Sequence, residues 1–207
     1  MTRSVPHDPI GSAGDHFVYT HKVGAGPEHP NKKWGLFSKE LSLEDASARY
    51  SLDAARREDW FGVVLIESEQ ERPTAYLQMC PRANGVELHK LDQFGSVMVA
   101  YTWRAYYTPS DDEPYDGDET RVFLSAITSY VYPEQPRFFM RNASLGHRSM
   151  TFGADGYAKD ERVTKQGFGE PSNVEMREFR DVDVSANWFR IPEFGDWDRF
   201  FHPEPRE

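Results

Sequence analysis

Cysteine is nearly absent from the chain, whose 207 residues include a single one, Cys80. One thiol excludes an internal disulfide and any zinc site built from paired cysteines. Cys80 follows Leu77 and Met79 in an apolar run, which is typical of a buried, unreactive thiol. The sequence also lacks a run of about 18 apolar residues and an apolar secretory signal near its start. These absences predict a cytoplasmic protein without membrane contact.

Basic residues are also fewer than acidic residues. The 24 Lys and Arg residues face 34 Asp and Glu residues, which gives a formal net charge of -10 and a pI near 5.2. Nucleic acids and anionic membranes are bound by surfaces with an excess of positive charge. The composition therefore predicts a protein that binds neither of them.

Motifs for catalysis, metals and cofactors are missing as well. The chain has no Gly-x-Ser-x-Gly sequence, and its seven histidines show no i,i+4 pairing with an intervening Glu. We interpret His89, flanked by Leu88, as a surface-facing strand histidine. We therefore predict no catalytic residue, no metal ligand and no cofactor, which favours a protein that is not an enzyme.

Residues 1–15 are rich in Pro, Gly, Ser and Asp and predict a flexible N-terminal arm, followed by a single domain over 16–207. A helix is expected from Ser42 to Arg57, because Ser42 suits the N-cap and Glu44 and Asp45 suit the first turn. Most of the remaining chain consists of β-rich runs separated by turn residues. The predicted strands include 16–23, 61–67, 74–80, 85–91, 96–107, 137–141, 149–152, 157–164 and 174–184.

This pattern predicts an α+β fold with an antiparallel twisted sheet, or a partly closed barrel, of about seven to nine strands. Residues 121–132 fit either a helix or a strand, and their β-branched and aromatic content favours a strand paired with 96–107. The Asp155-Gly156 pair predicts a tight turn.

The segment Pro109–Thr120 holds an unusual density of negative charge between these two strands. Its spacing does not fit a calcium loop, because Pro114 and Tyr115 interrupt the ligand positions. A solvated hairpin tip and a docking surface for a basic protein are both consistent with it. The six carboxylates are Asp111, Asp112, Glu113, Asp116, Asp118 and Glu119.

Large aromatic residues crowd the C-terminal region, where Asp196 is a possible cap of a short helix carrying Trp197, Phe200 and Phe201. Such a surface must be covered. Packing on the domain's own core is favoured, and contact with a neighbouring subunit is the alternative, which would make these aromatics partner-binding residues and allow a homo-oligomer.

Two functional hypotheses follow from these features. The first is a non-catalytic interaction protein, of an immunity or inhibitor type or an assembly subunit, whose 109–120 segment docks on a basic protein. The second is a small-molecule-binding protein or small enzyme with an aromatic-lined pocket in the sheet. The residues of that pocket would be Tyr76, Tyr101, Trp103 and Arg104.

Overall fold

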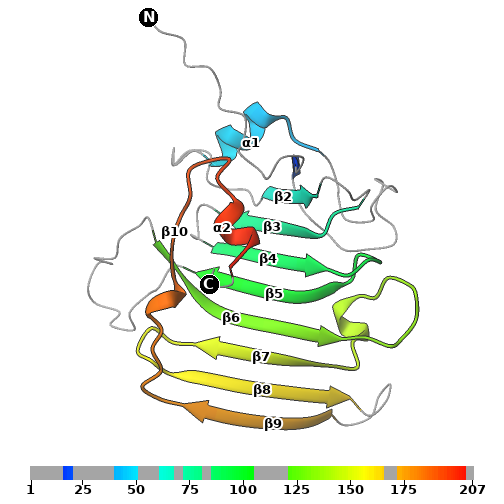
Figure 1. The fold of residues 1–207 in the computed structure, drawn as a ribbon, viewed down its shortest axis with the longest axis vertical. Coiled ribbons are helices and arrows are strands. Elements are labelled where there is room, and N and C mark those ends of the chain that lie inside the picture. Colours follow the sequence, from blue (N-terminus) through cyan, green and yellow to red (C-terminus); the bar gives the residue numbers. More distant parts are fainter. Residues whose placement is uncertain are drawn as a thin grey trace, which may run out of the picture.

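Within the residues that it describes, a computed structural model shows an open antiparallel sheet of ten strands with two short α-helices (Figure 1). The structure describes residues 16–20, 40–50, 61–67, 72–80, 85–104, 121–165 and 172–203. The sheet does not close, so the predicted antiparallel sheet is confirmed and the barrel form is wrong, and the ten strands exceed the predicted seven to nine. The predicted arm at 1–15 and the acidic segment at 109–120 lie outside the described residues.

Nine strands form a meander in which each strand pairs with the next one along the chain. They are β1 (His16–Thr20), β2 (Phe61–Ile66), β3 (Ala75–Cys80), β4 (Gly85–Leu91), β5 (Val97–Arg104), β6 (Arg121–Val131), β7 (Gly146–Phe152), β8 (Ala158–Lys165) and β9 (Ser172–Phe179). The tenth strand, β10 (Trp188–Arg190), returns to pair with β6. The strand predicted for 121–132 is thus confirmed, and it pairs with β5 as expected.

A short polar turn connects β7 to β8. Between β7 and β8, Gly156 has φ of 82°, and the Tyr157 amide donates to Asp155 Oδ1 over 3.0 Å. Glycine suits this left-handed backbone because it has no Cβ to clash. The predicted tight turn at Asp155-Gly156 is confirmed.

The described residues contain one helix in each of the two predicted regions. Helix α1 (Leu43–Tyr50) begins as predicted, with the Asp45 amide donating to Ser42 Oγ over 3.0 Å. Residues 51–57 of the expected helix lie outside the described residues. Helix α2 (Asp198–Phe201) has Trp197 at its N-cap position without a side-chain cap, so the cap predicted at Asp196 is wrong.

The hydrophobic core lies between the helices and one face of β1 to β6, which we call the covered face (Figure 1). Along this face, one cross-strand row is apolar as far as β7 and charged on β8 and β9. The row runs Tyr19, Val63, Leu77, Leu88, Tyr101, Ile127, Met150, Asp160 and Arg177. The change follows from the cover, because α1 and α2 lie over the first half of the sheet and not over β7 to β9 (Figure 1).

Candidate functional site

The residues of the predicted aromatic pocket do not converge. Tyr101 and Trp103 lie on the covered face, and the Trp103 ring is fully buried against Phe200, with ring centroids 5.0 Å apart. Tyr76 lies on the opposite face of the sheet, which we call the second face, with Val64 and Ile66. Arg104 is exposed rather than buried.

The C-terminal aromatics complete the core. Trp197, Phe200 and Phe201 are 0%, 0% and 2% exposed. Trp197 Nε1 donates to the Tyr19 hydroxyl over 3.2 Å, which ties the C-terminal segment to β1. Side chains buried in this way offer no surface to a partner, in agreement with the packing on the domain's own core that the sequence favours.

The two ends of the acidic segment are adjacent in the sheet. Strand β5 ends at Arg104, which pairs in register with Phe123 near the start of β6. The chain between them, which carries the six carboxylates, therefore leaves and re-enters the sheet at one end of a single hairpin. The acidic segment, which itself lies outside the described residues, therefore connects two neighbouring, paired strands.

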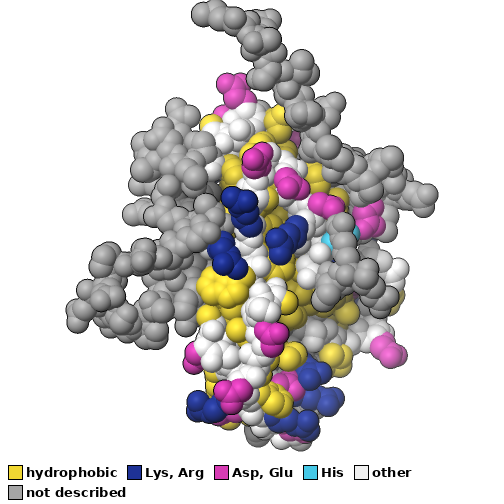
Figure 2. Space-filling model, turned by 60° about the vertical axis from the view of Figure 1, so that its left-hand side comes forward, with side chains coloured by type: hydrophobic (Ala, Val, Ile, Leu, Met, Phe, Trp, Pro, Cys, Tyr) yellow, Lys and Arg dark blue, Asp and Glu magenta, His cyan; other side chains and the backbone are white. Residues whose placement is uncertain are grey.

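Three exposed arginines, Arg104, Arg121 and Arg190, border this end of the sheet; we call them the arginine cluster. Arg121 lies opposite Arg190 of β10, and its guanidinium stands 5.0 Å from the centroid of the Trp188 ring. Figure 2 shows basic side chains gathered at mid-height on the side of the molecule that carries β10.

A second polar group of residues lies on the second face, around His89. Contrary to the interpretation of the sequence, His89 is 1% exposed. Its ring packs edge-on against Tyr76, with centroids 4.6 Å apart. Arg141, from the connection between β6 and β7, donates to His89 Nε2 over 3.0 Å. Glu87 Oε2 lies 3.5 Å from the same nitrogen.

The surroundings of His89 keep its ring neutral. Burial and the neighbouring Arg141 charge lower the pKa of His89 to about 3. Burial also opposes the charge on Arg141, but the nearby phenol groups of Tyr76 and Tyr130 accept its hydrogen bonds, and the pKa of Arg141 is raised. Since Nε2 accepts from Arg141, Nδ1 carries the proton, and it has no partner among the described residues.

We expect acidification to destabilise the protein before its carboxylates titrate. The unfolded chain takes up a proton on His89 as the pH falls through about 6.5, while the folded state stays neutral down to about 3. The free energy of unfolding should therefore fall by about 1.5 kcal/mol between pH 6.5 and 5. Urea denaturation at several pH values measures the free energy of unfolding.

His89→Gln is the matched variant for this pH series, because glutamine accepts a hydrogen bond but does not titrate. The variant should lose most of the pH dependence between pH 6.5 and 5. An unchanged slope in the variant would assign the proton uptake to another group.

Sequence reasoning missed this group because its members come from different elements. Arg141 reaches β4 through the β6–β7 connection, which nothing in the local pattern indicates. One signal was available for His89: its cross-strand neighbours Tyr76 and Ala100 are apolar or aromatic, which is typical of a covered position.

Within the described part of the chain, no group of three or more His, Cys, Asp or Glu residues is placed to hold a metal ion. No helix found there is long and apolar enough to cross a membrane. Comparisons of the chain with protein-family models, curated proteins and solved structures found no match in any of the three.

Proposed function

We propose that the chain is a non-catalytic interaction protein that docks on a basic protein surface through the acidic segment 109–120. The observation that supports the proposal is the pairing of the two strands that flank this segment. Strand β5 ends at Arg104 and β6 begins at Arg121, so the chain that carries the six carboxylates leaves and re-enters the sheet at adjacent, paired strands. Clustered charge of one sign attracts a complementary surface, speeds its diffusional encounter and orients the two proteins.

The filled core supports this function over the pocket hypothesis. Trp103, the largest side chain of the predicted pocket, packs edge to face on Phe189 and Phe200 with centroids 5.3 and 5.0 Å away. Tyr76 is separated from it by the sheet itself. An aromatic ligand pocket needs these side chains on one face around an open volume.

The arginine cluster sets the charge pattern that a partner would meet. Guanidiniums beside the carboxylates favour a partner whose basic patch is bordered by acidic residues, because like charges brought together on binding are costly. An immunity or inhibitor protein and a subunit of a larger assembly both have this kind of surface. The salt dependence of binding does not distinguish them, whereas the identity of the partner does.

The test is capture from native lysate on the immobilised chain at about 50 and about 500 mM salt, since exposed charges are largely screened at the higher value. The expected result is a stoichiometric basic protein that is retained at low salt and released at high salt. Bound small molecules are extracted and analysed in parallel. Recovery of a small molecule without a protein would contradict the docking function and support a ligand-binding role.

A further inference from the structure

Strand β9 is an open edge of the sheet. Within the described residues it pairs with β8 alone, and all eight of its side chains are exposed. The other outer strand, β1, is protected by the chain around Glu40, where the Leu41 amide donates to the Tyr19 carbonyl oxygen over 2.8 Å. An unprotected edge strand is a template for pairing with another strand.

The sequence of β9 has few of the features that usually prevent such pairing. It contains neither proline nor glycine, and its charges alternate in sign rather than repel an incoming strand. Val174 and Met176 are 55% and 56% exposed, and they share the second face of the sheet. Apolar side chains left in water on an open edge indicate a surface that becomes covered.

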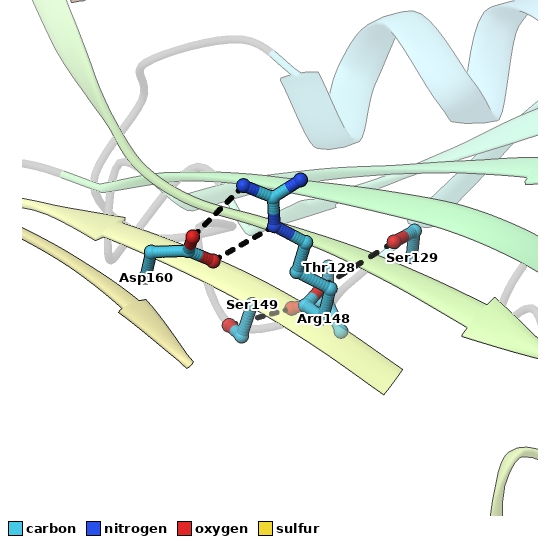
Figure 3. A network of polar contacts seen from close by, with 5 residues as sticks. All are labelled: Thr128, Ser129, Arg148, Ser149 and Asp160. Carbon is cyan, nitrogen blue, oxygen red and sulfur yellow. Dashed lines mark hydrogen bonds and ion pairs between the residues drawn. The ribbon is translucent and has the colours of Figure 1, made fainter. Parts of the chain in front are cut away.

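Charges of opposite sign face one another across the last strands of the sheet. Arg148 of β7 binds Asp160 of β8 through two hydrogen bonds of 2.8 Å (Figure 3). In register, Arg177 of β9 lies opposite Asp160, and Glu175 lies opposite Arg162. Both signs are visible at the β9 end of the molecule (Figure 2). At the edge of the sheet, β9 presents one acidic residue, Glu175, and one basic residue, Arg177, two positions apart on the same face.

We propose that β9 pairs in antiparallel fashion with β9 of a second copy of this chain, about a twofold axis at Met176. In this register Glu175 lies opposite Arg177 of the partner copy, and Arg177 lies opposite Glu175 of the partner copy. The alternation of charge then continues through the interface from β8 of one copy to β8 of the other. The two Met176 side chains meet on the second face, where they cover apolar surface.

The neighbouring registers are excluded by charge. Residues that pair directly across an antiparallel interface point to the same face of the sheet. The twofold axis can therefore pass through a residue of β9 but not between two neighbouring residues. An axis at Glu175 would place two Glu175 side chains opposite one another, and an axis at Arg177 would do the same with two arginines. Like charges directly opposite one another are destabilising. The acidic segment joins β5 to β6, so this pairing is independent of the proposed function.

Two lysine variants on the same face of β9 test the register. Met176→Lys places two ammonium groups at the twofold axis, and we expect the dimer dissociation constant to rise about tenfold or more. Val174→Lys introduces the same side chain at an equally exposed position, but there it lies opposite Glu178 of the partner copy. This variant should dimerise as well as the wild type or better. Sedimentation equilibrium over a range of protein concentrations measures all three proteins.

Two cysteine variants test the same register by disulfide cross-linking rather than by a dissociation constant. Met176→Cys brings two thiols opposite one another, with Cβ atoms about 5 Å apart, and should give a disulfide-linked dimer on mild oxidation. Val174→Cys should not, because the two Val174 positions are four residues apart along the paired strands. Three outcomes would overturn the proposal: a wild-type protein that stays monomeric, a wild-type protein that grows into filaments, or two lysine variants that affect dimerisation equally.

Discussion

Replacing Trp197 with alanine is expected to lower the free energy of unfolding by about 3–5 kcal/mol, because it leaves a cavity in the centre of the aromatic core. The indole is fully buried between Tyr50, Phe61 and Phe194, with ring centroids 5.1, 6.4 and 5.6 Å away. The variant also leaves the Tyr19 hydroxyl without the Nε1 donor. Chemical denaturation followed by circular dichroism measures the change.

Phe179→Ala is the control for this loss of stability. Phe179 is also a large aromatic residue, but it lies on the edge strand β9 and is 45% exposed. Its removal should change the free energy of unfolding by about 0.5 kcal/mol or less in dilute protein. Comparable losses in the two variants would contradict the account of the core, in which the C-terminal segment holds the covered face of the sheet together.

The second large effect is expected at the acidic segment. Changing Asp111, Asp112, Asp116 and Asp118 together to asparagine removes four charges while keeping the side-chain size. With exposed ion pairs worth about 0.2–1 kcal/mol each, the affinity for the captured partner should fall by about 2 kcal/mol, or roughly thirtyfold. Titration calorimetry at about 50 mM salt gives the affinities.

The matched control removes four carboxylates from other exposed sites. Glu40, Glu44, Glu134 and Glu193, changed together to glutamine, alter the net charge by the same amount. If the position of the charge determines binding, this variant keeps its affinity within about threefold. If both variants weaken binding equally, net charge alone would explain the attraction, and the segment would have no specific role.

The sequence predicts most strands of the meander because they carry local signals, whereas the strand predicted at 137–141 is wrong, since this stretch is a connection that leads into a 3-10 helix at Arg141. Apolar residues on both faces identify β5 as a central strand, and the Asp155-Gly156 pair identifies the β7–β8 turn from its backbone requirement alone. The strand at Arg121–Val131 was ambiguous because its apolar residues fit both periods. In the structure this segment pairs with β5 on one side and with β7 on the other. Contacts between different parts of the chain therefore decide in favour of a strand.

The candidate site was harder to predict, for a related reason. Side chains along β5 point alternately to the two faces of the sheet, which places Trp103 and Arg104 on opposite faces. This alternation does not tell which of the two faces is covered. Tyr76 was grouped with Trp103 by chemical type, although the two strands place them on opposite faces. Arg104 is the last residue of β5 and lies on the face opposite to Trp103, where its side chain is exposed.

The most direct test of the docking function is the association rate constant of the chain with its captured partner, measured by stopped flow as ionic strength is varied. Electrostatic docking predicts a rate constant that falls about tenfold or more between about 20 and 500 mM salt, with a dissociation rate constant that changes far less. The four-asparagine variant should lose most of this dependence. An association rate constant that is independent of salt in the wild type would contradict the account.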